Sequence, residues 1–223
     1  SPVEVLPVGW KRIPLPLVMN VDAQFNIDYS VDVALPLGSP HSNVCKNLIE
    51  TTIHALSMNC SFILPKELAI TLNVECLKKS FAATTPDLII AEYEGAHQPI
   101  DSSYFQSASV YILPSISDTM PYSLVESINA GVPVLMSKDV GWAHIIPSDI
   151  RPIPRFVFED TQQLLIQAKV LSENFHARKL LWEHQKHHLI ETMSSRKHLL
   201  KSAFPHIMQK VEVEEIQLTL DFA

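Results

Sequence analysis

Glycine is scarce in this chain: 5 of the 223 residues are glycine, against 16 prolines. Backbone loops that wrap closely around phosphate groups depend on glycine, because any Cβ would stand in the way. The sequence also lacks the G-x-G-x-x-G fingerprint of dinucleotide-binding domains. It therefore offers few flexible phosphate-binding loops.

Cysteine is also rare, and the three residues of this type are Cys45, Cys60 and Cys76. One of them remains over after any pairing, and their spacing does not match that of metal ligands. We expect all three to be buried, reduced thiols, which is typical of a reducing compartment. The chain is accordingly expected to be cytoplasmic.

Long apolar runs and an excess of positive charge are missing as well. No run approaches the roughly 20 apolar residues that span a bilayer, and residues 1–14 lack the apolar core of a secretory signal. The formal net charge of −7 argues against nucleic acid as a partner. With 47 % hydrophobic residues, the chain is suited to one globular core with an appended segment.

What the sequence does contain is a strand–loop–helix–strand pattern over residues 109–137. An apolar run at 110–113 is followed by a polar loop, and Pro121 then opens a helix-length segment that ends before Gly131. Helices favour proline at their start and glycine just past their end. A second apolar run at 132–136 completes a βαβ unit, whose two strands should be parallel and buried on both faces.

Similar apolar runs and helical periodicities alternate through the rest of the chain. We predict further strands at 30–38, 61–65, 87–93 and 155–159, and helices at 43–58, 66–80, 160–172 and 176–203. The alternation predicts an α/β fold, a Rossmann-like doubly wound parallel sheet of about six strands with helices on both faces. Residues 1–27 are expected to be a lead-in, residues 28–203 the domain and residues 204–223 a tail.

Apolar positions predict the buried faces of two of these helices. In the first helix, the residues expected to face inward are Leu48, Ile49, Ile53 and Leu56. We expect Asp160 to cap a later helix. The inward residues of that helix are expected to be Leu164, Leu165, Ala168 and Leu171.

Two carboxylates flank the predicted helix start at Pro121, with Asp118 in the loop before it and Glu126 in its first turns. Ligands of parallel sheets bind beyond the carboxyl ends of the strands. A carboxylate there can accept the hydroxyl groups of a ribose or hexose, and a helix N-terminus suits a phosphate. The arrangement describes a nucleotide-sugar pocket. In the structural alternative, Ser123 and Glu126 form a capping box, and Glu126 only bonds to its own backbone.

The segment ILPSISDTMPYSLVESINAGVPVLMS closely resembles the donor-site signature of retaining GT-B glycosyltransferases, the glycosyl transferases group 1 that include glycogen synthase and sucrose synthase relatives. The positions that match in order are Pro114-Ser115, Asp118, Pro121, Glu126 and Ala130-Gly131-Val132-Pro133-Val134. The match is strong over residues 109–137 and looser over residues 28–203. The resemblance implies one half of a GT-B fold, the carboxyl-terminal domain that binds the sugar donor.

The resemblance also implies roles for individual residues. Glu126 would hold the ribose hydroxyls of the nucleotide. Asp118 would be the catalytic residue and would approach the transferred sugar. The backbone N–H groups of Tyr122, Ser123 and Leu124 would cradle the diphosphate.

Further substrate-binding residues follow from the same resemblance. Gly38 corresponds to the loop after the first strand, and Lys46 or His41 would supply a cation for the diphosphate. The loop after the third strand, which contains Gly95, usually meets the base. The implied substrate-binding set is completed by Ser115 and Thr119.

Three features depart from the family pattern. The first acidic residue is an aspartate, Asp118, where glutamate is commoner, and Pro121 lacks the N–H that a glycine would offer. No arginine occurs in residues 37–47, where the family carries one for the diphosphate. A fixed guanidinium there would stabilise the charge that develops on this leaving group.

The implied activity is transfer of a hexose from a nucleoside-diphosphate sugar to a hydroxyl of a carbohydrate, lipid or protein acceptor, with retained stereochemistry. No cofactor and no metal ion is implied, and we expect His184, His187 and His188 to form a solvated helix face. The expected partner is a missing N-terminal domain, and a peripheral membrane association of the whole protein stays open. The alternatives are a non-catalytic scaffold or partner-binding domain, and a GT-B epimerase or phosphorylase.

Overall fold

A computed structural model of the chain describes residues 19–36, 45–74, 76, 88–91, 102–118 and 121–203. Parallel strands form one 6-stranded sheet in the order β3-β2-β1-β4-β5-β6. The strands are β1 Val31–Ala34, β2 Phe62–Pro65, β3 Leu88–Ala91, β4 Ala108–Leu113, β5 Val134–Ser137 and β6 Val157–Phe158. This is the strand order of a doubly wound Rossmann-like domain, and it confirms the predicted fold class.

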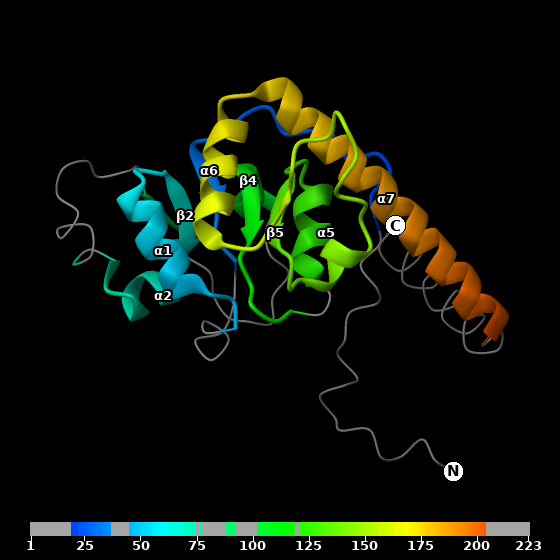
Figure 1. Cartoon of the computed structure of the whole chain (residues 1–223), viewed down its shortest axis with the longest axis horizontal. Helices are drawn as coiled ribbons and strands as arrows, with labels where there is room; N and C mark the ends of the chain where they lie inside the picture. Colours follow the sequence, from blue (N-terminus) through cyan, green and yellow to red (C-terminus); the bar gives the residue numbers. More distant parts are fainter. Residues whose placement is uncertain are drawn as a thin grey trace, which may run out of the picture.

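Helices join the strands and cover both faces of the sheet (Figure 1). They are α1 Leu48–Ser57, α2 Lys66–Thr71, α4 Ser102–Gln106, α5 Tyr122–Asn129, the 3-10 helix η3 Gly141–His144, α6 Thr161–Ser172 and α7 Phe175–Ala203. α1 contacts α6, and α4 contacts α5. Right-handed crossovers place these two pairs on opposite faces, because the chain steps one way from β1 to β2 and the other way from β4 to β5.

The central strand β4 is buried along its whole length. Within it, Tyr111 pairs with Ala34 of β1 on one side and with Val134 of β5 on the other. A strand covered on both faces needs apolar side chains in both directions, so it shows no alternation of polar and apolar residues. The apolar run at residues 110–113 is explained by this position in the sheet.

Gly131 ends α5 and makes room for another part of the chain. The N–H of Gly131 donates to the carbonyl oxygen of Ile128 (3.1 Å), and the N–H of Val132 donates to that of Ser127 (3.0 Å), which is the Schellman arrangement. Gly131 has a φ of 87°. A Cβ on this residue would lie 2.2 Å from the carbonyl oxygen of Gln24. Glycine is therefore required both by the left-handed backbone and by the close approach of the segment that contains Gln24.

The buried face of α1 differs from the expectation. Leu48 and Leu56 are buried, as predicted, whereas Ile49 and Ile53 are 49 % and 37 % exposed. The helix also begins later than predicted, because Asn47, directly before it, adopts a left-handed φ of 53°. Residues 43 and 44 lie outside the described residues.

Two threonines take the place of the isoleucines on the inner face of α1. Thr51 and Thr52 are fully buried, together with Ala55. The hydroxyl of Thr51 donates to the carbonyl oxygen of Asn47 (2.6 Å), and that of Thr52 donates to the carbonyl oxygen of Leu48 (2.7 Å). These bonds remove most of the free-energy cost of burying a hydroxyl. The prediction from hydropathy alone was therefore wrong for the buried face of α1.

The prediction for α6 is confirmed. Asp160 is its N-cap, and the carboxylate accepts a hydrogen bond from the N–H of Gln163 (3.0 Å). All the residues that were expected to face inward are buried: Leu164, Leu165, Ala168 and Leu171.

α7 crosses the amino-terminal end of the sheet and contacts both α6 and α5. It begins at the top of Figure 1 and descends along the right side. The fully buried side chain of Gln185 donates to the carbonyl oxygen of Val134 (2.7 Å) and accepts from its N–H (2.9 Å), at the first residue of β5. The indole N–H of Trp182 donates to the carbonyl oxygen of Ile128 (2.9 Å). Within the described residues, neither α7 nor any other helix is long and apolar enough to cross a membrane.

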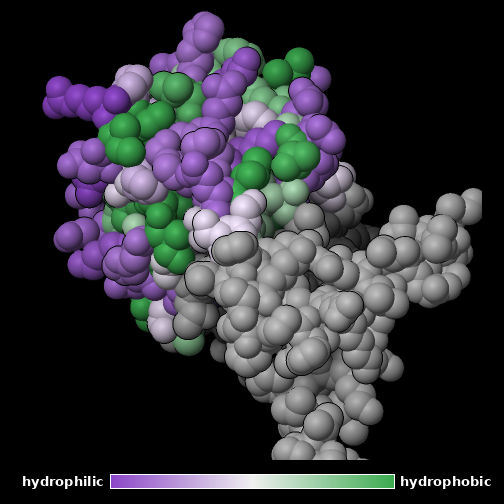
Figure 2. All heavy atoms as spheres, turned by 90° about the vertical axis from the view of Figure 1, so that its right-hand side faces the viewer, coloured by the Kyte–Doolittle hydropathy of each residue, from purple (hydrophilic) through white to green (hydrophobic). Residues whose placement is uncertain are grey.

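The segment before β1 is fastened along α7. The ammonium of Lys186 donates to the carbonyl oxygens of Val21 (2.6 Å) and Ala23 (2.8 Å). The guanidinium of Arg178 lies over the rings of Phe25 (5.2 Å to the centroid) and Tyr29 (4.3 Å). Figure 2 shows that hydrophilic and hydrophobic side chains are intermixed on this side of the molecule.

The expectation of three buried thiols is wrong for two of them. Cys60 is buried, but Cys45 and Cys76 are exposed. Cys45 lies in the turn before α1, and Cys76 lies beyond Thr71, the last residue of α2. Neither position is covered by the sheet, so the small apolar side chain does not by itself bring burial.

Candidate functional site

The chain leaves the carboxyl end of β4 in a turn that is held on both sides. The N–H of Ile116 donates to the carbonyl oxygen of Cys45 (2.8 Å), just before α1. Asp118 forms a parallel bridge with Val140, and its carbonyl oxygen accepts from the N–H of Gly141 (2.9 Å). The backbone of Asp118 is thus fixed between the start of α1 and the start of η3.

Pro121 sets the start of α5. It is the N-cap of the helix, with extended backbone angles. Its carbonyl oxygen accepts from the indole N–H of Trp142 in η3 (3.2 Å) and from the N–H of Leu124 (3.3 Å). The hydrogen bond from Trp142 therefore orients the first turn of α5.

The capping-box alternative for Glu126 is wrong. A capping box would need Ser123 at the N-cap position. The N-cap is Pro121, and it makes no side-chain capping hydrogen bond. Glu126 lies in the second turn of α5 with its side chain partly buried, and this burial raises the pKa of its carboxyl.

Asp118 and Lys46 lie near each other beyond the carboxyl end of β4, and both are partly buried. Burial raises the pKa of the Asp118 carboxyl, and the ammonium of Lys46 opposes this shift. Burial likewise lowers the pKa of Lys46, while Asp118 opposes that shift. Lys46 precedes α1 instead of lying within it. Carboxylates and amines with pKa values moved towards neutrality are typical of functional sites.

Two buried hydroxyls lie on the same strand and its exit. The side-chain oxygens of Tyr111 and Ser115 have no hydrogen-bond partner among the described residues, and both side chains are completely buried. Most buried polar atoms are paired, so each exception calls for an explanation. Ser115 belongs to the predicted set. Tyr111 does not, and its only signal in the sequence is a tyrosine among aliphatic strand residues.

Burial and nearby groups act on the phenol of Tyr111. Burial raises the pKa of its phenol, the adjoining Ser123 hydroxyl lowers it, and the carboxylates of Glu126 and Asp118 raise it further. The ring packs edge-on against Phe105 of α4, with 5.0 Å between the ring centroids.

The first turn of α5 contains three predicted residues with different surroundings. The side chain of Tyr122 is 58 % exposed, that of Ser123 is partly buried and that of Leu124 is completely buried. The first N–H groups of a helix have no partner within it, which leaves those of Tyr122 and Ser123 pointing out of α5. The remaining predicted residues lie outside the described residues: Gly38, His41, Gly95 and Thr119.

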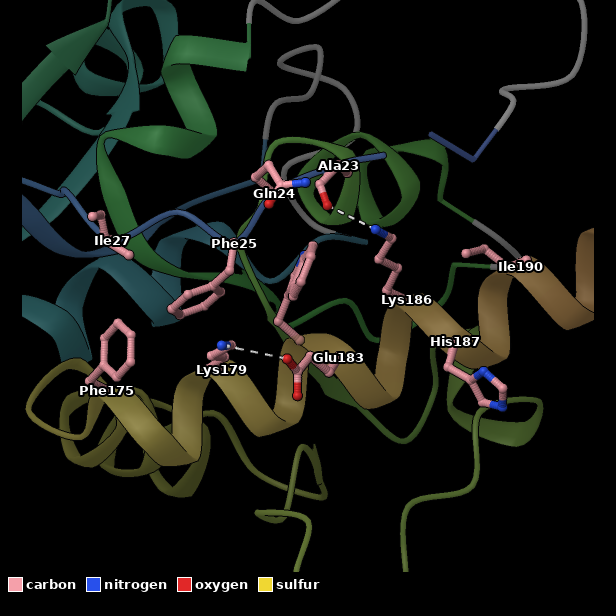
Figure 3. A pocket seen from close by; sticks show the side chains of 11 residues that line it. Ala23, Gln24, Phe25, Ile27, Phe175, Lys179, Glu183, Lys186, His187 and Ile190 are labelled. Atoms are coloured by element: carbon pink, nitrogen blue, oxygen red, sulfur yellow. Dashed lines mark hydrogen bonds and ion pairs between the residues drawn. The ribbon is translucent and has the colours of Figure 1, made fainter. Parts of the chain in front are cut away.

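Two surface grooves occur among the described residues, and neither is lined by Asp118 or Glu126. The first, of about 570 Å³, runs between residues 23–27 and α7 (Figure 3). The ion pair of Lys179 and Glu183 (3.8 Å) lies along its α7 wall, and the bond from Lys186 of α7 to Ala23 crosses it. The second, of about 440 Å³, lies beside β6. Neither groove is lined by a predicted site residue, and the first is bridged by the side chain of Lys186.

The histidines of α7 are less solvated than expected. His184 and His188 are partly buried, and burial is the main cause that lowers the pKa of His188. A ring nitrogen of His184 lies 2.7 Å from the carbonyl oxygen of Pro147. His187 and His188 lie 3.3 and 3.4 Å from the carboxylate of Glu191. Across the ranges described, no three histidine, cysteine, aspartate or glutamate side chains are grouped so as to hold a metal ion.

Comparison with known proteins finds one matching family model and a set of structures with similar folds. Residues 98–173 match the model of the family Glycosyl transferases group 1. A search of curated proteins finds no match. The matched segment runs from before α4, through β4, the turn at Asp118 and α5, to the end of α6.

Three solved structures illustrate the similarity of fold. A UDP-forming alpha,alpha-trehalose-phosphate synthase from Burkholderia xenovorans has 15 % identity and a TM-score of 0.52, over 76 % of this chain and 41 % of that chain. The alpha,alpha-trehalose 6-phosphate synthase from Burkholderia multivorans has 14 % identity and a TM-score of 0.54, over 86 % and 44 %. A mutant of S. aureus TarM, in a complex that contains UDP, has 11 % identity and a TM-score of 0.57, over 84 % and 37 %.

At these identities the likeness concerns the fold alone, and the chain spans about two fifths of the length of these structures. The carboxyl end of β4, with Asp118 and Glu126, lies inside the part that matches the family model. Residues 98–173 are therefore similar to the glycosyl transferases group 1 family, and the fold around them is similar to the fold of these structures.

Proposed function

We propose that this chain is the donor-binding domain of a retaining glycosyltransferase, which binds a nucleoside-diphosphate sugar and passes the sugar to a hydroxyl acceptor. One observation carries the proposal. Asp118 and Glu126 flank the start of α5 at the carboxyl end of the central strand, and both carboxylates are partly buried. A carboxylate in this position accepts hydrogen bonds from vicinal hydroxyls, which a ribose and a hexose both supply.

The residues around the start of α5 take different roles. Glu126 accepts the ribose hydroxyls, and the N–H groups of Tyr122 and Ser123 face the diphosphate at the positive end of the helix dipole. Lys46 is the cation beside Asp118, where relatives carry an arginine, and it offsets negative charge on the departing diphosphate. Asp118 faces the transferred sugar and stabilises the positive charge that develops on it in an oxocarbenium-like transition state.

The similar structures suggest which nucleotide to test first. One is named as a UDP-forming synthase, and another is a complex that contains UDP. These names describe those proteins, and they make UDP the first probe for this chain. Because the chain spans about two fifths of such structures, the acceptor side of the reaction would come from a further domain.

A second candidate function is a non-catalytic domain that binds partners, or nucleotides without turnover. It is favoured by the absence of arginine from residues 37–47, which leaves Lys46 and His41 as the nearby cationic side chains in that stretch. Burial lowers the pKa of Lys46, so its positive charge is less secure than that of a guanidinium. Nucleotide binding that persists without any transfer in the whole protein would support this candidate.

Titration calorimetry with UDP-glucose, UDP-N-acetylglucosamine, GDP-mannose and ADP-glucose tests the proposal. We expect one of them to bind, and Glu126→Ala to weaken its binding by at least about a hundredfold, because two charge-assisted hydrogen bonds are lost. Glu173→Ala removes the same charge from an exposed site and should leave affinity unchanged. If folded wild-type protein binds none of the four, the proposal is wrong.

A further inference from the structure

One face of α7 forms a wall of the groove that separates this helix from residues 23–27 (Figure 3). The lining residues of α7 recur three or four positions apart, as on a single helix face, and include Phe175, Lys179, Trp182, Lys186 and Ile190. From the first to the last of these, the groove follows the helix for about 22 Å. Its length suits an extended segment of polypeptide.

The floor of the groove is apolar and partly open to solvent. The ring of Phe25 packs edge-on against that of Phe175, with 5.5 Å between the centroids, and lies 5.8 Å from the ring of Trp182. Phe175 is nevertheless 44 % exposed, and Ile27 on the opposite wall is 61 % exposed. Contiguous apolar side chains that remain exposed along a groove mark an interaction site.

The groove also carries positive charge. The ammonium of Lys186 is partly buried, and its hydrogen bonds within the described ranges go to the carbonyl oxygens of Val21 and Ala23. Lys179 lies 3.8 Å from the carboxylate of Glu183. Over its whole length, α7 contains six lysine and arginine residues and two glutamates, a net charge of +4, in a chain whose net charge is −7. A complementary occupant therefore combines apolar side chains with negative charge.

The chain itself contains such a segment shortly after α7. Residues 204–223 lie outside the described residues, and residues 211–223 have the sequence VEVEEIQLTLDFA. Apolar and polar residues alternate strictly from Ile216 to Phe222, which is typical of an extended segment with one apolar face. Residues 211–223 also contain three glutamates and one aspartate, with no lysine or arginine. Apolar side chains and negative charge are thus combined in one stretch.

The lengths agree as well. An extended segment over residues 216–222 spans about 20 Å, which matches the length of the groove. To reach the groove, the chain must return from Ala203 to Ile190, a distance of about 20 Å along the helix. Residues 204–215 span up to about 40 Å when extended, so they can make this return. The tether keeps the segment at an effective concentration on the order of millimolar.

We propose that residues 216–222 dock in this groove as an extended segment that runs antiparallel to α7. The direction follows from the connection, because a chain that returns along α7 from Ala203 passes Ile190 before Phe175. The side chains that face the apolar floor are Ile216, Leu218, Leu220 and Phe222. This surface is separate from the proposed nucleotide site, so either proposal can fail without the other.

A benzophenone amino acid at residue 175 of the full chain tests where the segment lies. Phe175 suits this replacement because it lines the groove and is already 44 % exposed. We expect light to join residue 175 to residues 216–222 of the same chain, which mass spectrometry of the digested monomer would identify. A crosslink to a second copy, or the absence of any crosslink to residues 211–223, would overturn the proposal.

Matched variants test which face of the segment is covered. Leu220→Asp places a charge on the face that meets the floor and should lower the crosslink yield by about tenfold, because burial of a leucine contributes about this factor to docking. Thr219→Asp adds the same charge on the other face of the extended segment and should leave the yield unchanged. Equal yields from the two variants would contradict docking through the apolar face.

A second pair of variants changes the groove instead of the segment. Ile27→Asp should lower the yield as Leu220→Asp does, and the fold should tolerate it because Ile27 is exposed. Ile70→Asp is the control, since Ile70 of α2 is 70 % exposed and does not line the groove. Hydrogen exchange gives an independent readout without the crosslinker: the amides of residues 216–222 should exchange more slowly in wild type than in Ile27→Asp. Equal exchange in these two proteins would show that the groove is not the docking site.

Discussion

The two ends of the central sheet treat their polar groups in opposite ways. At the amino end, buried polar groups are hydrogen-bonded to each other. The side chain of Gln185 bonds the N–H and the carbonyl oxygen of Val134, and the indole N–H of Trp182 donates to the carbonyl oxygen of Ile128. At the carboxyl end, the buried hydroxyls of Tyr111 and Ser115 have no partner among the described residues. The same sheet thus has one end that is closed by its own chain and one end that is not.

Arg178 is the exception that sharpens this contrast. It lies at the closed end and is 2 % exposed, and its Nε and Nη1 atoms have no hydrogen-bond partner within the described ranges. Its guanidinium nevertheless lies over the rings of Phe25 and Tyr29, which supply a cation–π contact in place of hydrogen bonds. The unsatisfied group at the closed end is therefore compensated by its contact with two aromatic rings.

Gly131→Ala should produce the largest change in stability and tests the closed end most severely. The new Cβ would meet the carbonyl oxygen of Gln24 at 2.2 Å, at a φ of 87° that disfavours a side chain. We expect the free energy of unfolding to fall by about 3 kcal/mol or more. Chemical denaturation measures this, with Gly141→Ala as the control because Gly141 has no positive φ. Equal losses in the two variants would mean that the approach of the Gln24 segment does not constrain residue 131.

Gln185→Leu should have the next largest effect. It removes the partners of the N–H and the carbonyl oxygen of Val134 at once, in a fully buried position. Unsatisfied buried backbone groups lower the free energy of unfolding, here by about 2–4 kcal/mol. The same substitution at exposed Gln162 of α6 should change it by less than about 0.5 kcal/mol. A Gln185→Leu loss as small as that of Gln162→Leu would show that α7 does not close the amino end through this residue.

Glu126→Gln should have the smallest effect on stability. The effect should be a gain, in contrast to the losses that we expect from substitutions at the closed end. Burial raises the pKa of Glu126 in the folded chain, so the folded state holds this proton more tightly than the unfolded state does. The ionised carboxylate then costs stability above the folded-state pKa, and the cost disappears below the unfolded-state value. We expect the variant to be more stable than wild type at neutral pH by less than about 1 kcal/mol.

The measurement is denaturant unfolding at several pH values, with Glu173→Gln at an exposed position as the control for loss of one charge. The stability difference between wild type and Glu126→Gln should shrink as the pH falls through the folded-state pKa. A Glu126→Gln variant that is less stable than wild type at neutral pH would indicate that the carboxylate already has a stabilising partner in the free protein.

Much of the fold could be predicted from the sequence, and α6 shows why. Its cap at Asp160 and its inward residues depend on contacts within a few positions along the chain. The inner face of α1 could not be predicted in the same way. Its threonines are tolerated inside because their hydroxyls bond carbonyl oxygens of the helix, and its isoleucines remain exposed because no described element covers them fully.

The candidate site likewise contains residues that could be predicted from the sequence and residues that could not. The motif places Asp118 and Glu126 around one helix start, because only a few residues separate them. Tyr111 precedes that motif on β4 and carries no motif signal of its own. Its phenol is buried because α5 and α4 pack against β4.

The sequence by itself determined the alternation of strands and helices, the glycine that ends α5, and the pair of acidic residues around the start of that helix. These features follow from local periodicity and from the backbone preferences of single residues. Only the tertiary structure decided that Lys46 lies near Asp118, that Gln185 bonds the first residue of β5, and that the Tyr111 hydroxyl is buried with no partner among the described residues. Each of these depends on two segments far apart in the chain, and their meeting is set by how helices pack on a sheet.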